Sequence, residues 1–199
     1  MTDDRQGRDK QAHDTEKRQR QRYLSEELER RDETEPEIDS AAAEEFEADL
    51  DEIAFPVTAA ELVEEMGDRE IETPATSYTV GELLPETQAE IFRQPAEVRV
   101  LIQRPTIAAA MKRVIEASET LPNTEIGRSQ REAYEKTFRE LKAIDADDED
   151  EGIRVIADWI TDQIRAKGKI PGSRDVRREA ARFCRKNGYS VRNDEWLGI

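Results

Sequence analysis

The chain has 199 residues, and its 47 Asp and Glu residues outnumber its 31 Lys and Arg residues to give a formal net charge of −16. Only 36% of the residues are hydrophobic, and no apolar run approaches the roughly 20 residues that cross a bilayer, which excludes a membrane-spanning protein. The lone cysteine, Cys184, and the lone histidine, His13, exclude an intramolecular disulfide, a Cys-rich metal site and a His-pair metal site.

Residues 1–52 are predicted to be a disordered, acidic arm. They contain only two aromatic residues, Tyr23 and Phe46, and few aliphatic ones, which is too little apolar surface to offset the entropy of ordering. Glu–Arg pairs at i,i+4 allow a solvated helix over residues 14–31, either frayed or ordered on a partner. The acidic residues 32–52 are interpreted as a linker.

The folded part is predicted to begin near Ile53. Thr58 and Glu61 have the spacing of a capping box, in which each side chain satisfies a backbone N–H of the other residue. A short helix to about Met66 follows, closed by Gly67.

The rest of this region alternates short strands and helices. Residues 69–73 and 77–80 are β-like and are joined by a turn at 74–76, with Ile71, Tyr78 and Val80 as inward side chains. After Gln94-Pro95 a short helix is expected over residues 96–103. Residues 53–104 are therefore predicted to form a small α+β module.

Four short motifs in this module resemble a known family. They are Phe-Pro-Val-Thr at 55–58, Glu-Glu-Met-Gly-Asp at 64–68, Gly-Glu-Leu-Leu-Pro at 81–85 and Gln-Pro-Ala-Glu-Val at 94–98. The resemblance, over about residues 53–104, is to a small domain found in haloarchaeal proteins with no assigned function. The whole chain is also similar to longer uncharacterised haloarchaeal relatives. The resemblance implies a salt-adapted protein and brings no catalytic residues with it.

A helical extension is predicted over residues 105–144. One helix, at 106–118, aligns Ile107, Ala110, Met111, Val114 and Ile115 on one face, and a second, at 129–144, aligns Ala133, Tyr134, Phe138 and Leu141. Both are interpreted as core helices.

The acidic run 145–151 is predicted to separate this extension from the C-terminal unit. Its alternating acids before Gly152 resemble the start of a calcium-binding loop, with Asp158 at the twelfth position. Glu replaces Asp or Asn at two ligand positions, however, and Arg154 occupies the usually apolar eighth position. A solvated acidic linker is favoured, and no metal site is predicted.

Residues 152–199 are predicted to form a basic unit with a helical pair. Ile153, Ile156, Trp159, Ile160 and Ile164 form the apolar stripe of a helix over 153–167. A break at 168–172 follows, with Ser173 as the expected N-cap of a last helix over 174–187 and Gly188 beyond its end. Cys184 lies on the apolar side of this helix with Val176, Ala180 and Phe183, which favours a small buried hydrophobe. The tail 189–199 is expected to pack back through Val191, Trp196 and Leu197.

The charge of the chain is segregated. Residues 1–52 carry a net charge of −10 and residues 53–151 one of −11, whereas residues 152–199 carry +5. The last helix holds most of the positive charge of this unit, and its candidate contact residues are Arg174, Arg177, Arg178, Arg182, Arg185 and Lys186. Two helices around a glycine-containing break, the second one basic, are similar to a helix-turn-helix. The same pattern also fits a helical hairpin whose basic side pairs with carboxylates of this chain or of a protein partner.

Composition also indicates the environment. The basic residues are 23 Arg and only 8 Lys, and few lysines, many acids and a small apolar fraction favour a cytoplasm with molar salt. The Debye length is about 3 Å at 1 M salt, so a strongly negative surface repels itself little there. Phosphate binding by counterion release alone fails at such salt, and bidentate or stacking contacts, which arginine makes well, are required. An ordinary acidic, partly disordered protein is the alternative. Since the first residues are polar and charged, no signal peptide is predicted.

Together these patterns predict an α+β, mostly α protein: a disordered arm, a central module, added helices and a C-terminal helical pair. No P-loop, dinucleotide-binding or zinc-protease motif is present, and neither a cofactor nor an enzymatic activity is expected. We expect a cytoplasmic interaction or regulatory protein of a halophile that binds nucleic acid or an acidic partner through its last helix. The alternative is a structural or adaptor protein whose basic tail packs on its own acidic core or on a protein partner. A pocket gathering Glu61, Glu64 and Glu65 with Arg104 would instead favour an enzyme.

Overall fold

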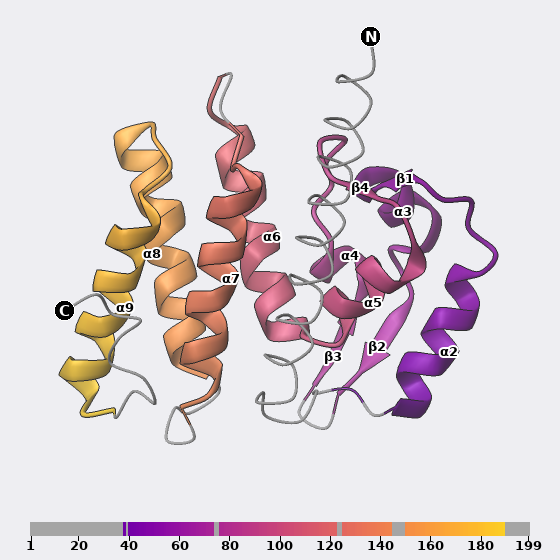
Figure 1. The fold of residues 1–199 in the computed structure, drawn as a ribbon, viewed down its shortest axis with the longest axis horizontal. Coiled ribbons are helices and arrows are strands. Elements are labelled where there is room, and N and C mark those ends of the chain that lie inside the picture. Colours follow the sequence, from indigo (N-terminus) through magenta and orange to yellow (C-terminus); the bar gives the residue numbers. More distant parts are fainter. Residues whose placement is uncertain (1–37, 39, 74–75, 123–124, 145–149, 190–199) are drawn as a thin grey trace, which may run out of the picture. The chain divides into compact units, whose positions relative to one another are not determined.

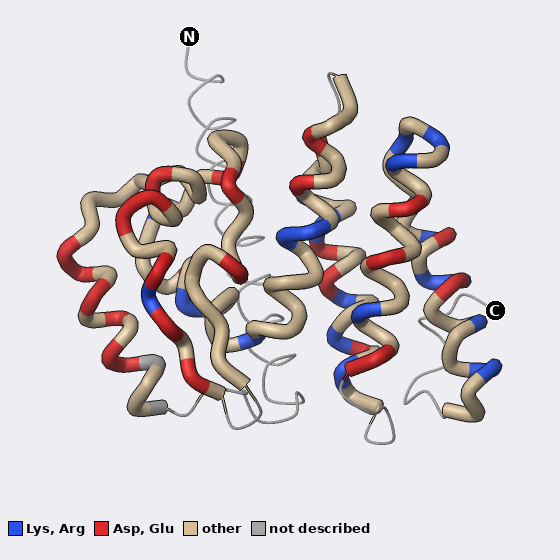
Figure 2. The backbone as a smooth tube through the Cα atoms, turned by 180° about the vertical axis from the view of Figure 1, so that it is seen from behind, with Lys and Arg blue, Asp and Glu red and all other residues tan. Residues whose placement is uncertain are grey.

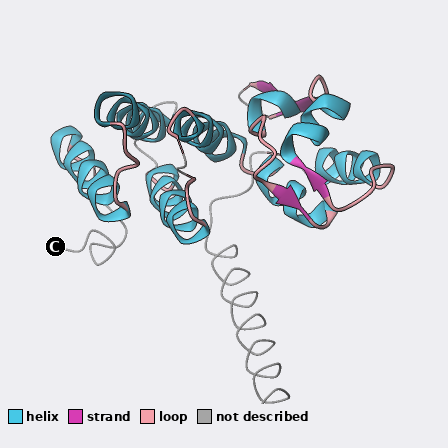
Figure 3. Ribbon diagram, turned by 90° about the horizontal axis from the view of Figure 1, so that it is seen from above, coloured by secondary structure: helices cyan, strands magenta, loops and turns pink. Residues whose placement is uncertain are grey.

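The computed structural model describes residues 38, 40–73, 76–122, 125–144 and 150–189, all of which belong to one compact unit, residues 36–199. Eight helices and four short strands lie within these ranges, which confirms the prediction of an α+β, mostly α protein (Figure 1). The strands are confined to the first half of the described chain (Figure 3). The predicted helix at 14–31, residues 145–149 of the second predicted acidic linker and the tail beyond residue 189 lie outside the described residues.

The first described helix, α2 (Ser40–Leu50), corrects the prediction of a linker over residues 32–52. Phe46 and Leu50 are 1% and 0% exposed, and with Ile38 they join the core of the module. Phe46 and Leu50 lie at i,i+4 on one face of the helix. Helix α5 (Pro95–Ile102) packs against α2. The segment was predicted to be a linker because its high content of Asp and Glu outweighed these two apolar residues.

The module contains two separate antiparallel strand pairs. Strand β1 (Val57–Thr58) pairs with β4 (Ile91–Phe92), and β2 (Glu70–Glu72) pairs with β3 (Ser77–Thr79). The predicted capping box is confirmed, because the Thr58 side chain and Glu61 each accept a backbone N–H of the other at the start of α3 (Ala59–Met66). Ile71 and Val80 are buried as predicted, although Val80 begins the next helix rather than ending a strand.

A second capping box, which the sequence analysis missed, starts the short helix α4 (Val80–Leu83). Thr79 and Glu82 repeat the pattern of Thr58 and Glu61 at the same spacing. The other end of α4 is closed from outside the module, because the Lys112 ammonium donates to the carbonyls of Gly81 (2.6 Å) and Leu84 (3.1 Å). A cation at a helix C-terminus also complements the helix dipole.

Four longer helices follow: α6 (Pro105–Glu119), α7 (Arg128–Lys142), α8 (Glu151–Lys167) and α9 (Ser173–Asn187). Nearly every apolar position predicted on these helices is buried, with Ala133 and Trp159 only partly so. Helix α8 begins two residues earlier than expected. Asp150 precedes this helix and has a backbone φ of 56°. Its carboxylate accepts a hydrogen bond from the Lys142 ammonium at 2.5 Å.

Helix α6 is shared by two hydrophobic cores. Its Ala108 belongs to the core of the module, whereas Ile107, Met111 and Val114 belong to the core formed with α7, α8 and α9. In agreement, α6 contacts α4 and α5 on the module side and α7 and α8 on the other. Helix α6 therefore connects the module with the helices that follow it, because it packs against both.

Candidate nucleic-acid interface on the last helix

Helix α9 is strongly amphipathic, and its apolar side fixes which way its charges point. Val176, Ala180 and Cys184 are completely buried, and α7 and α8 pack against this side. Cys184 is therefore the small buried hydrophobe that the sequence predicts. Because one side of the helix is held in the core, the opposite side must face solvent.

The two ends of α9 are defined by glycines. Ser173 is the first residue of the helix and makes no side-chain cap, so the prediction of Ser173 as N-cap is wrong by one position, and Gly172 takes that place. Asp175 lies in the first turn, where the helix dipole favours an anion. At the other end Gly188 has φ 74°, which confirms the predicted glycine beyond the helix.

The loop that leads into α9 is anchored to α7 at one carbonyl. The Gln130 amide donates to the Pro171 carbonyl oxygen at 2.7 Å, and the Tyr134 hydroxyl donates to the same oxygen. Tyr134 is fully buried, and this burial raises the pKa of its hydroxyl to about 12. Two side chains of α7 thus hold the position from which α9 starts.

The structure places five of the six predicted contact residues on the solvent side. Arg174, Arg178, Arg182, Arg185 and Lys186 are exposed, whereas Arg177 is half-buried beside the apolar face. Three of these residues lie on one side of α9: Arg174, Arg178 and Arg185. At 100° per residue their positions around the helix axis differ by at most about 40°, and they extend over about 17 Å along the axis. We call these three residues the arginine row.

The ion pairs of this face are local to the helix. Arg178 lies 3.8 Å from Asp175, and Arg182 lies 2.6 Å from Glu179, each at i,i+3. Arg174, Arg185 and Lys186 have no ion-pair partner among the described residues. Exposed pairs of this kind contribute little free energy, so the face remains open to another anion.

Further cations lie next to the arginine row. Arg165, Lys167 and Lys169 are exposed at the end of α8 and in the loop before α9. Figure 2 shows Lys and Arg in blue along α9 and this loop, whereas Asp and Glu in red predominate on α2. The positive charge predicted for the C-terminal unit is therefore gathered on its outer helix and the adjoining loop.

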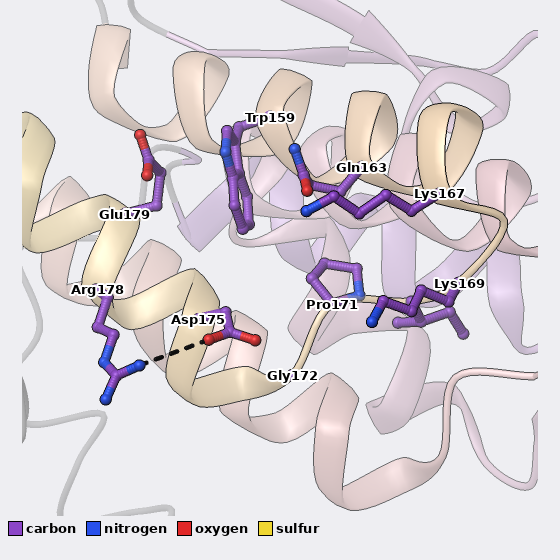
Figure 4. A pocket seen from close by; sticks show the side chains of 10 residues that line it. Trp159, Gln163, Lys167, Lys169, Pro171, Gly172, Asp175, Arg178 and Glu179 are labelled. Carbon is purple, nitrogen blue, oxygen red and sulfur yellow. Dashed lines mark ion pairs between the residues drawn. The ribbon is translucent and has the colours of Figure 1, made fainter.

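A pocket of about 410 Å³ opens between α8 and α9. Trp159 and Gln163 line it from α8, Lys169 and Pro171 from the loop, and Asp175, Arg178 and Glu179 from α9 (Figure 4). Trp159 was predicted to lie in the apolar stripe of α8, but it is only half-buried and forms part of the pocket wall. Its position at the edge of that stripe was the only feature of the sequence that indicated partial exposure.

A second pocket, of about 370 Å³, brings together Glu61, Glu64 and Glu65. Arg104, which the sequence analysis grouped with them, does not line this pocket. The backbone and side-chain hydrogen bonds of Thr58 lower the pKa of Glu61, so this carboxylate serves the capping box. Glu64 and Glu65 are exposed.

A partly buried charge cluster ties the module to α7. Arg131 on α7 lies 3.0 Å from Glu90, which precedes β4, and both side chains are 20% exposed. Burial raises the pKa of Glu90, although the positive charge of Arg131 opposes this shift. Burial also raises the pKa of Glu135, and there the charges of Arg139 and Arg104 act in the opposite direction. The nearby charge of Glu90 further raises the pKa of Glu135. We assign this cluster a structural role.

The described ranges contain neither a metal-binding cluster nor a membrane-spanning helix. No group of three or more His, Cys, Asp or Glu residues there is arranged to hold a metal ion, and the acidic residues 147–149 lie outside those ranges. No helix in the same ranges is long and apolar enough to cross a bilayer.

Fold and surface together define a small α+β protein with an exposed basic helix at the end of its described part. Residues 40–114 match the model of a family of unknown function (DUF5789). No curated protein and no solved structure matches the chain. The family match begins at the first residue of α2 and reaches into α6, and so extends beyond the predicted resemblance at 53–104 on both sides. It includes α2, the helix that the sequence analysis assigned to a linker.

Proposed function

We propose that this protein binds nucleic acid through the arginine row of α9, as a binding protein rather than an enzyme. The observation that supports this best is the row itself: Arg174, Arg178 and Arg185 follow one another on the side of the helix away from the core. Guanidinium groups pair with phosphate oxygens in a bidentate way and also stack on bases. The neighbouring Lys167 and Lys169 continue the positive surface toward the loop.

The overall charge makes a local basic surface necessary for such binding. A chain with a net charge of −16 repels a polyanion at long range, so contact depends on a patch where cations are concentrated. Ten of the residues from 151 to 189 are Lys or Arg and five are Asp or Glu. The surface of α9 supplies that patch.

We also propose that the protein works in the cytoplasm of a halophile, as the acid-rich, lysine-poor composition suggests. Salt weakens phosphate contacts, with a log–log slope of about −0.7 per contact on single strands and −0.9 on duplex DNA. Arginine, which makes up 23 of the 31 basic residues, retains stacking and bidentate contacts under these conditions.

The test is a fluorescence-anisotropy titration of labelled DNA, single-stranded and duplex, with the full chain from about 0.05 M to about 1 M salt. The full chain is needed because α7 forms part of the core beneath α9. We expect the variant with Arg174→Ala, Arg178→Ala and Arg185→Ala to bind more weakly. The magnitude of its salt slope should fall by about 2 on single strands and by about 3 on duplex DNA.

A matched control removes the same charge elsewhere. Arg93, Arg128 and Lys136 are exposed on the module and α7, and replacing all three by Ala should leave the salt slope unchanged. Equal weakening in both triple variants would show that only net charge matters. Absence of binding at the lowest salt would overturn the proposal and favour the alternative, an adaptor whose basic helix meets acidic protein surfaces.

A further inference from the structure

The pocket between α8 and α9 has one aromatic wall and a polar opposite side. Trp159, Gln163 and Lys167 recur every four residues along α8, so they lie on one side of that helix. Asp175 and Glu179 lie across from them on the first half of α9, Arg178 points outward from α9 beside Asp175, and Pro171 and Gly172 close the end near the loop (Figure 4). The pocket therefore offers an indole surface, an amide, two carboxylates and cations within one cavity.

We infer that this pocket takes a single unpaired nucleobase of a bound strand, stacked on the indole of Trp159. The inference rests on the proposed function, because it adds a base site to the phosphate contacts of the arginine row. Stacking of a base on an aromatic side chain is a recurrent feature of single-strand binding. The pocket volume, about 410 Å³, lies in the range of sites that hold small organic groups.

The charged groups of the pocket fit a nucleotide unit rather than a purely apolar ligand. Lys167 and Lys169 are exposed at the rim, where the phosphates that flank a bound base would lie. Asp175 and Glu179 line the same cavity, and their carboxylates accept hydrogen bonds from the exocyclic amino groups of adenine, guanine or cytosine. The Gln163 amide both donates and accepts. Because the two carboxylates repel phosphate, the base occupies the interior and the backbone stays outside.

Arg178 connects the pocket with the arginine row. Its side chain lines the pocket beside Asp175, 3.8 Å away, and its position on α9 also belongs to the row. A strand that follows the row thus passes the mouth of the pocket. The base contact would moreover survive high salt better than phosphate contacts do, since stacking releases no counterions.

The experiment uses the fluorescence of Trp159. The chain has two tryptophans, so Trp196→Phe leaves Trp159 as the only one. This variant is titrated with oligo(dA), with an abasic strand of equal length and charge, and with adenosine monophosphate. We expect oligo(dA) to quench Trp159, the abasic strand to bind without quenching, and the mononucleotide to quench only at much higher concentration because it engages none of the row.

Substitutions then separate stacking from phosphate binding. Trp159→Leu should weaken oligo(dA) binding about tenfold or more and leave abasic-strand binding unchanged, and Trp159→Phe should restore most of the loss. Tyr78→Leu, at another half-exposed aromatic residue in the module, is the matched control and should change neither affinity. Unchanged binding of the abasic strand also shows that the α9 surface of Trp159→Leu is intact.

The outcomes distinguish this inference from the proposed function. Binding of oligo(dA) and of the abasic strand with equal affinity and no quenching would overturn the base pocket and leave the arginine row standing. Failure of both strands to bind would overturn the proposed function itself. Quenching by the mononucleotide at concentrations where oligo(dA) has no effect would identify a site for free nucleotides and overturn the strand-bound base.

Discussion

At the scale of single residues, Tyr134 has the clearest long-range role. Its buried hydroxyl donates to the Pro171 carbonyl, and Gln130 donates to both groups, at 3.0 Å to the hydroxyl and 2.7 Å to the carbonyl. This carbonyl belongs to the loop that carries Lys169 and one end of the base pocket. A tyrosine of the core therefore positions a loop of the proposed binding surface.

Tyr134→Phe should change both the free energy of unfolding and its dependence on pH. Near neutral pH we expect the variant to be less stable by about 1 kcal/mol, since one buried hydrogen bond is lost. The folded chain raises the pKa of Tyr134 from 10.0 to about 12, so the unfolded chain releases the proton first. The wild type then loses up to about 2–3 kcal/mol as the pH rises through this interval, and the variant does not. Urea unfolding from about pH 7 to about pH 12 measures both free energies. Parallel pH profiles would contradict the prediction.

At the scale of elements, α2 shows how an acidic segment becomes part of a core. Its exposed side is rich in Glu and Asp, and its charges are used in pairs, with Glu47 2.7 Å from Arg99 and Asp49 2.8 Å from Arg69. Surface pairs of this kind contribute little, so the burial of Phe46 and Leu50 holds the helix in place. The family match from residue 40 agrees with treating α2 as part of the module.

Phe46→Ala should therefore destabilise the protein strongly. Removing a buried phenyl ring leaves a cavity and costs about 3–5 kcal/mol. Ile91→Ala is the matched control, because Ile91 is 56% exposed, and it should cost less than about 1 kcal/mol. Denaturant unfolding of both variants compares the two free energies. A small effect of Phe46→Ala would mean that α2 is a loosely attached arm.

At the scale of the whole molecule, charge is the dominant feature. The chain has a net charge of −16, and many of the carboxylates of the described part are exposed. Repulsion among them destabilises the compact state at low salt and is screened as the Debye length falls from about 10 Å at 0.1 M to about 3 Å at 1 M. Hydrophobic burial in the two cores must balance this repulsion.

The thermal unfolding midpoint should accordingly rise as KCl increases toward about 1 M. The matched variant Glu64→Gln, Glu65→Gln and Glu72→Gln removes three exposed negative charges from the module, so its midpoint should rise less steeply. Differential scanning calorimetry at several salt concentrations measures both slopes. A midpoint that is independent of salt would contradict the proposal of a halophilic protein.

Much of the fold was accessible from local patterns. The Thr58 capping box, the apolar faces of α6 to α9 and the glycine beyond α9 depend on residues a few positions apart, where hydrogen bonds and side-chain faces follow directly from spacing. The exposure of five basic residues on α9 follows from the same amphipathic pattern. Only Arg177 departs from it, since it lies beside the buried face.

Other features were decided by packing between distant segments. Lys112 closes α4 across 31 and 28 positions, and Gln130 reaches Pro171 across 41. The same holds for Phe46 in the module core and for the pocket beside Trp159, because each requires a second element that sequence spacing does not specify. The sequence by itself determined the elements, their buried sides and the place of the positive charge, since these are set by local backbone geometry and composition. Only the tertiary structure decided which elements meet, because that depends on how the apolar surfaces fit together in space.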